Sequence, residues 1–188
     1  MMKADVKFRY WLTCAVAAGW QMEEGEYQRP LYVGSIATPE TLDSLTFGQL
    51  VRLSHLGESN SIFYDVCQII LGMDAAAVNE ARALDVVTLC GWVTQEVNKI
   101  NGLFKKLSTK PTEQERRAGI DKLNFGLFGL MDRYARRMGI HNHDDVEAVP
   151  WIRVYRCVEI DNETDKFQKR YMEITQDDYR RKNSKHSR

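Results

Sequence analysis

The sequence contains little of what marks several large protein classes. It has only 4 prolines and 12 glycines in 188 residues, which excludes collagen-like and Pro/Gly-rich low-complexity architectures. Net charge is also absent, because 26 lysines and arginines balance 26 aspartates and glutamates. A neutral chain has no global field that attracts nucleic acid or an anionic membrane, so any such binding has to be local.

Long hydrophobic runs are absent as well. No stretch approaches the roughly 20 apolar residues that span a bilayer. Ala15-Val16-Ala17 has the A-x-A form of a signal-peptidase site, but only Tyr10–Cys14 would form the apolar region before it. Export signals need about 7–15 apolar residues there, so we expect a cytoplasmic protein.

The four cysteines form no C-x-x-C pair, which is the spacing typical of zinc and redox sites. Cys67 and Cys90 lie among apolar neighbours, where a free cysteine behaves as a small hydrophobic residue. We therefore expect buried thiols in a reducing compartment for the set Cys14, Cys67, Cys90 and Cys157.

Hydrophobic residues make up 44% of the chain and charged residues 28%, the profile of a globular protein. The length predicts one domain, with or without an extension. Glycines and prolines interrupt the first 45 residues. There, residues 8–16 are read as a strand or a short helix and residues 27–36 as a strand.

Helical signals begin at residue 46. Thr46-Phe47-Gly48-Gln49 has the form of a capping box, in which the threonine and glutamine side chains satisfy each other's backbone N–H groups. Gly72 is expected to end a second helix, and Asp74 to open a short third one.

The clearest helical pattern covers residues 85–107. At 100° per residue, its apolar side chains share one face about 100° wide. That face consists of Val86, Leu89, Cys90, Val93, Val97, Ile100, Phe104 and Leu107.

A second capping box at Thr112 predicts one helix that reaches Met138, kinked near Gly119 and ended by Gly139. Its expected stripe is Leu123, Leu127, Leu130, Met131, Tyr134 and Met138.

Beyond the loop at residues 141–143, Pro150 suits the first position of a further helix. A last, weakly amphipathic helix passes through Phe167, Tyr171 and Ile174, and a frayed basic tail starts at Arg180. The sequence thus predicts an all-α multi-helix bundle with an irregular, partly β N-terminal segment. The expected parts are residues 1–45, a helical core at 46–160, and a C-terminal helix and tail at 161–188.

His141, His143, Asp144 and Asp145 are the only cluster with metal-ligand chemistry. A closed site needs a further ligand, and Asn142 with the acidic residues suits a helix N-terminus instead. We expect no metal site, and a metal-dependent enzyme using this loop is the weakest alternative.

Ala135 and Gly139 have the spacing of a helix-turn-helix motif, followed by a new helix. However, Asp144 and Asp145 would enter the groove and repel phosphate. A helical DNA-binding regulator is therefore an alternative, and nucleic acid is not the expected partner. The basic residues Arg133, Arg136, Arg137, Arg153 and Arg156 are interpreted as solvated helix faces.

The sequence contains no Gly-rich phosphate loop, G-x-S-x-G or H-E-x-x-H motif. Spacing alone leaves open a Cys–His pair assembled by the fold. We expect no catalytic residue, no cofactor and no enzyme.

Phe125-Gly126-Leu127-Phe128-Gly129 is the most distinctive local pattern. Leu127 joins the main stripe, whereas Phe125 lies about 160° away on a helical wheel. Glycine costs about 1 kcal/mol relative to alanine inside a helix, so Gly126 and Gly129 suggest close approach by another backbone. Either an intramolecular helix near Trp151 covers this face, or Phe125, Gly126, Phe128 and Gly129 form a partner-binding groove.

Three segments together resemble the tail assembly chaperones of long-tailed phages and prophages. They are Leu45–Leu50, Trp92–Ile100 and Asp121–Gly129, and the resemblance covers residues 45–175. It implies a small, mostly helical protein of the bacterial cytoplasm. Such a protein binds the tape-measure protein during tail assembly, keeps its apolar helices soluble and leaves as the tube polymerises. The tail-tube protein and a homo-oligomer are further partners to consider.

Val93 lies in the middle of the apolar face at residues 85–107. Val93→Asp should unfold the helical core, because it buries a charge that has no partner. Circular dichroism and thermal melting measure the effect. An unchanged spectrum and melting temperature would show that the face is assigned wrongly.

Overall fold

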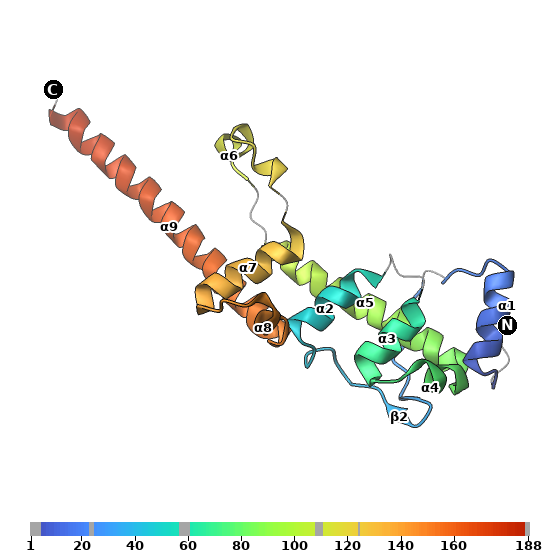
Figure 1. Ribbon diagram of the computed structural model, residues 1–188. Helices are drawn as coiled ribbons and strands as arrows, with labels where there is room; N and C mark the ends of the chain where they lie inside the picture. The colour runs from blue at the N-terminus through green and yellow to red at the C-terminus, as the bar shows by residue number, and fades with distance from the viewer. Residues whose placement is uncertain (1–4, 23–24, 57–60, 108–110, 124, 187–188) are drawn as a thin grey trace. The chain divides into compact units, whose positions relative to one another are not determined.

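The computed structural model describes residues 5–22, 25–56, 61–107, 111–123 and 125–186 (Figure 1). Helices dominate these residues, with one two-stranded antiparallel sheet, which confirms the all-α fold class. The chain forms two compact units, one of residues 1–103 with 147–151 and one of residues 104–146 with 152–188. No helix of the described part is long and apolar enough to cross a membrane.

The described part of the first unit contains a short sheet and the helices α1 to α5. Residues 8–16, read as a strand or short helix, are helical. The expected strand at residues 27–36 is wrong for most of its length, because Gly34, at φ 60°, turns the chain between two-residue strands. The elements are α1 (Phe8–Ala17), β1 (Tyr32–Val33), β2 (Ile36–Ala37), α2 (Phe47–Ser54), α3 (Ile62–Leu71), α4 (Ala75–Glu80) and the greater part of α5 (Ala83–Leu107).

Three predicted helix ends in this unit are confirmed, at Thr46, Gly72 and Asp74. The Thr46 hydroxyl accepts from the Gln49 amide, and the Gln49 side chain accepts from the Thr46 amide. Gly72 ends α3 in the left-handed region, and the Asp74 carboxylate accepts from the Ala77 amide at the start of α4.

One face of α5 forms the centre of the core, as its periodicity predicts. Val93 is 1% exposed, and Trp92 and Val87 are buried although they lie outside the predicted face. The burial is wider than predicted because other segments cover the helix. Phe104 and Leu107, at its C-terminal end, are only half-buried.

The irregular segment before β1 is attached to α5 by Tyr27. A Cβ at Gly91 would lie 2.2 Å from the Tyr27 ring, so the ring rests directly on the helix backbone. Gln95, one turn later, accepts from the Tyr27 amide at 3.2 Å and donates to the Gly25 carbonyl. The Arg29 guanidinium closes the same segment by donating to the Thr38 carbonyl at 3.0 Å.

Residues 45–47 pair with residues 149–151. The Phe47 amide donates to the Val149 carbonyl at 2.7 Å, and the Trp151 amide donates to the Leu45 carbonyl at 3.1 Å. The Trp151 indole also donates to the Leu42 carbonyl at 2.9 Å. Pro150 is therefore not the first helical residue as predicted, because it takes part in this pairing opposite Thr46.

The single helix predicted from Thr112 to Met138 is wrong. Gly119 and Gly126 have φ values of 90° and 52°, which interrupt the helix twice. The Thr112 capping box and the end at Gly139 are confirmed. The elements of the second unit are α6 (Glu113–Arg117), η2 (Ile120–Lys122), α7 (Gly126–Met138), most of α8 (His143–Glu147) and α9 (Trp151–His186) after its first residue.

The C-terminal region is one helix, where two helices and a frayed tail were predicted. α9 continues through Arg180 to His186, and the basic residues after Arg180 extend it. Its first turns are buried at Trp151, Val154 and Val158, whereas every described side chain from residue 163 to residue 183 is exposed.

The prediction of buried thiols is confirmed for two cysteines. Cys67 and Cys90 are buried, Cys157 is half-buried and Cys14 is exposed. Burial raises the pKa of the Cys67 thiol to about 12, so this thiol stays protonated at neutral pH. The prediction is wrong for Cys14, because α1 turns that residue outward.

Gly91 and Gly102 on α5 provide a matched pair. Gly91→Ala should lower stability by about 1–3 kcal/mol, because its Cβ collides with the Tyr27 ring. Gly102→Ala meets no described atom within 4 Å and should raise stability by up to about 1 kcal/mol through helix propensity. Denaturant midpoints report both changes. Equal effects would contradict the Tyr27 contact.

Candidate functional site

The predicted site residues lie at the start of α7 and expose two aromatic rings. Phe125 is 67% exposed and Phe128 is 59% exposed. Leu123, which was predicted to join the buried stripe, is 59% exposed instead. Three large apolar side chains within six residues therefore face solvent.

Phe125 itself precedes the helix. It is the N-cap of α7, and Gly126, with its positive φ, starts the helix. A helical wheel cannot place Phe125, because the regular 100° step does not extend through this break. The exposure of Phe125 has to be taken from the structure.

Local structure explains why glycine occupies positions 126 and 129. Gly126 supplies the left-handed conformation at the start of α7, which other residues rarely adopt. A Cβ at Gly129 would lie 2.7 Å from the Phe125 Cβ, so Gly129 makes room for Phe125 within the same turn. The expectation that another backbone approaches these glycines is therefore wrong, because the described atoms nearest to a Cβ at Gly129 belong to Phe125 and a Cβ at Gly126 meets none within 4 Å.

Phe128 contacts α8. Its ring meets the His143 ring edge-on, with centroids 5.2 Å apart. His143 Nε2 lies 3.7 Å from Asp132 Oδ1, and Asp132 also binds Arg136 one turn later. His143 thus lies against α7. The Phe128 ring contacts His143, and more than half of the Phe128 surface is exposed to solvent.

The His141 and His143 loop forms a helix start. The Asn142 side chain accepts from the Asp144 amide at 3.1 Å, as the capping prediction requires. Across the described residues, no group of three or more His, Cys, Asp or Glu side chains is arranged to hold a metal ion.

Arg133 and Arg137 connect α7 to α9, which corrects their interpretation as solvated residues. Arg137 binds the Asp161 carboxylate and donates to the Cys157 carbonyl at 3.1 Å. Arg133 lies 3.2 Å from the same carboxylate and donates to Asn162. In the sequence, these contacts are indicated only by two arginines that lie one turn apart on one helix. Their shared acceptor, Asp161, is 28 residues from Arg133 and 24 residues from Arg137.

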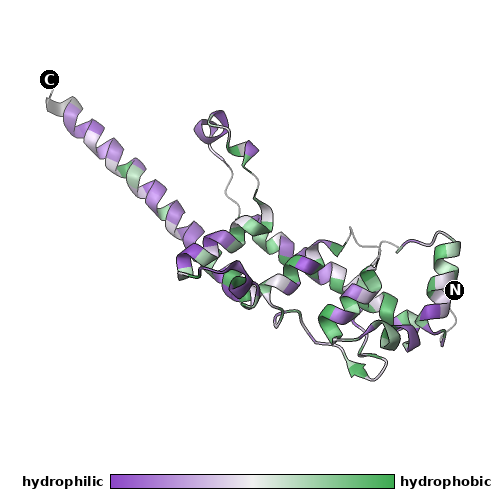
Figure 2. Cartoon of the chain, in the orientation of Figure 1, coloured by the Kyte–Doolittle hydropathy of each residue, from purple (hydrophilic) through white to green (hydrophobic). Residues whose placement is uncertain are grey.

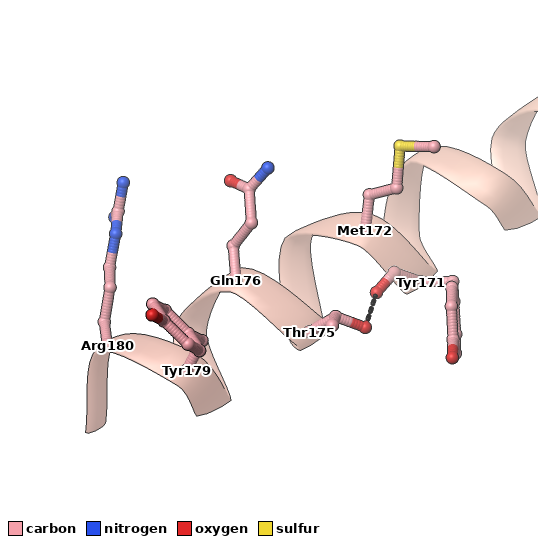
Figure 3. A pocket seen from close by; sticks show the side chains of 6 residues that line it. All are labelled: Tyr171, Met172, Thr175, Gln176, Tyr179 and Arg180. Carbon is pink, nitrogen blue, oxygen red and sulfur yellow. Dashed lines mark hydrogen bonds between the residues drawn. The ribbon is translucent and has the colours of Figure 1, made fainter. Parts of the chain in front are cut away.

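The exposed half of α9 carries a second set of apolar side chains. Figure 3 shows Tyr171, Met172 and Tyr179 along this part of α9, where the Thr175 hydroxyl donates to the Tyr171 carbonyl at 2.8 Å. The exposed apolar residues of α9 are Ile160, Phe167, Tyr171, Met172, Ile174 and Tyr179.

Comparisons with known proteins give no match: no family model, no curated protein and no solved structure matches the chain.

Asp161 is the carboxylate on which both arginines converge. Asp161→Asn should lower stability by about 1–3 kcal/mol, because it weakens two charge-assisted contacts. Glu96→Gln on α5 is the control, since its partner Lys99 is an exposed i,i+3 neighbour and such pairs contribute about 0.5 kcal/mol or less. Urea titration of both variants measures the difference. Similar midpoints would show that the arginines do not join the helices.

Proposed function

We propose that this chain is a non-enzymatic phage tail assembly chaperone that binds apolar helices of the tape-measure protein. The observation that carries the proposal is the group of exposed apolar side chains at the start of α7: Leu123, Phe125 and Phe128. The resemblance over residues 45–175 supports the same function, with the bacterial cytoplasm as its place and the tail-tube protein as a second candidate partner.

The surface at α7 suits an apolar helix as its ligand. Monomeric proteins seldom expose clustered large apolar side chains, and such clusters mark binding sites. Aromatic anchors of this kind contribute much of the binding energy in helix-in-groove complexes. Contact with His143 restricts the Phe128 ring before binding, which reduces the entropy lost when a partner is bound.

The neighbouring charges provide a polar rim. Asp132 and Arg136 pair with each other along α7, one turn beyond Phe128. Charged side chains on a partner helix can form ion pairs with Asp132 and Arg136 in place of this pair. The apolar face of the same helix then covers the Phe125 and Phe128 rings. In contrast, Arg133 and Arg137 are held by Asp161, which leaves fewer arginines for the DNA-binding alternative.

Phe125→Ala combined with Phe128→Ala tests the function. Both rings are more than half exposed, so the denaturant midpoint should change little. Capture of co-expressed tape-measure protein should weaken by more than about 30-fold, because an aromatic anchor contributes over about 2 kcal/mol.

Leu31→Ala is the matched control, because Leu31 is an apolar residue of the first unit that is 66% exposed, as Phe125 is 67% exposed. It should leave capture unchanged. Undiminished capture by the double phenylalanine variant, or a large fall in its denaturant midpoint, would contradict the proposed surface.

A further inference from the structure

The exposed part of α9 carries an apolar seam with the spacing of a coiled coil. Ile160, Phe167 and Ile174 follow each other at intervals of seven residues, and Tyr171 lies four after Phe167 and three before Ile174. These four side chains are 54–63% exposed. The described part of α9 is mostly hydrophilic, with a few hydrophobic positions along its length (Figure 2).

The seam is separate from the face of α9 that packs within its own unit. Val154 and Val158 are 0% and 4% exposed, and at 100° per residue they lie about 120–160° around the helix from Ile160. These four exposed side chains therefore lie outside the buried face of α9, which ends at the half-buried Cys157 and at Val158.

Alternating intervals of three and four residues define the a and d positions of a heptad, which bury against a second helix. In this notation Cys157, Thr164 and Tyr171 are a residues, and Ile160, Phe167 and Ile174 are d residues. The seam is thus six positions long, and its only polar member is Thr164.

We propose that the α9 seam binds the α9 seam of a second copy of this chain in antiparallel orientation. In an antiparallel coiled coil, a residues face d residues of the other helix. One register places Ile160 opposite Tyr171, Thr164 opposite Phe167 and Cys157 opposite Ile174. Two-fold symmetry repeats each of these contacts, so every layer contains an apolar side chain and only the layer of Thr164 and Phe167 also contains a polar one.

The charges beside the seam select this orientation. Residues at g positions face each other across an antiparallel pair. In the same register Glu163 lies beside Arg170 of the second copy, and Arg156 lies beside Asp177. Each contact joins opposite charges and occurs twice. The intrahelical pairs Glu163–Lys166 and Arg156–Glu159 are exposed, and such pairs are weak competitors.

A parallel pair satisfies fewer charges. It would set Glu163 beside Gln168 and Arg170 beside Thr175, so neither charge gains a partner. It would join Asp177 to Lys182, but Arg156 would face Asp161, which already binds two arginines of α7. The charge pattern therefore fits an antiparallel second copy better than a parallel one.

The oligomeric state of the full chain tests the seam. Sedimentation equilibrium across micromolar concentrations should show a dimer. Phe167→Asp should raise the dimer Kd by more than about 100-fold, because it buries an unpaired charge in the seam. Met172→Asp is the control, since Met172 is equally exposed but lies about 100° from the neighbouring seam residue Tyr171. Circular dichroism establishes that both variants remain helical.

A charge exchange tests the orientation. Glu163→Arg and Arg170→Glu should each raise the dimer Kd about 3–10-fold at low salt, because each change opposes like charges at two symmetric contacts. Combining the two substitutions should restore the wild-type Kd, because opposite charges face each other again. In a parallel pair these two residues lie beside Gln168 and Thr175, so neither single substitution should weaken the dimer, and that result would overturn the antiparallel orientation.

A wild-type chain that stays monomeric throughout the concentration range overturns the proposal. A dimer that Phe167→Asp leaves intact overturns the seam, and a double charge variant as weak as the single ones overturns the antiparallel register. The Phe125 and Phe128 substitutions should leave the dimer unchanged, so this inference and the proposed chaperone function fail or succeed independently.

Discussion

Burial of one face of α5 is the constraint on which the first unit depends. Val86, Leu89, Val93 and Val97 are all at most 4% exposed, and this continuous apolar surface has to be covered by other segments. Gly91 allows one of them to approach without a Cβ in between, so the Tyr27 ring contacts the helix backbone. The irregular N-terminal segment is ordered by its fit to α5, since β1 and β2 are only two residues each.

The second unit depends more on polar contacts. Few of its described side chains are fully buried, and the carboxylate of Asp161 joins α7 to α9 by accepting from two arginines. Asn162, the next residue, donates to the Leu107 carbonyl at 2.6 Å and so satisfies the C-terminal end of α5. Adjacent residues of α9 thus bind two helices, and this explains why α9 is half-buried here and exposed beyond residue 162.

The sequence predicts features whose cause lies within one turn of helix. Thr46 and Thr112 cap their helices through partners three residues away, and Gly72 and Gly139 end theirs by their own conformation. Periodicity also predicts α5, because 25 residues give a long enough pattern.

Features with remote causes are the ones that the sequence leaves undetermined. The Trp151 indole binds a carbonyl 109 residues away, and no local pattern announces that contact. For the candidate site, the residues at Phe125–Gly129 stand out by composition. Their exposure depends on the left-handed Gly126, which interrupts the helical phase that a wheel assumes.

The length of α9 links the two surfaces of the second unit. Its contacts to α5 and α7 are complete by Asp165, yet the helix continues to His186. Helices in proteins gain most of their stability from packing an amphipathic face, and exposed i,i+3 ion pairs such as Glu163–Lys166 add only a few tenths of a kcal/mol each. The apolar seam from Ile160 to Ile174 can provide more stabilising free energy than these pairs, because its burial against a second helix removes apolar surface from water. Through the same seam, α9 would bind the α9 of a second copy. Phe125 and Phe128 on α7 would then remain available to bind a helix of a different protein.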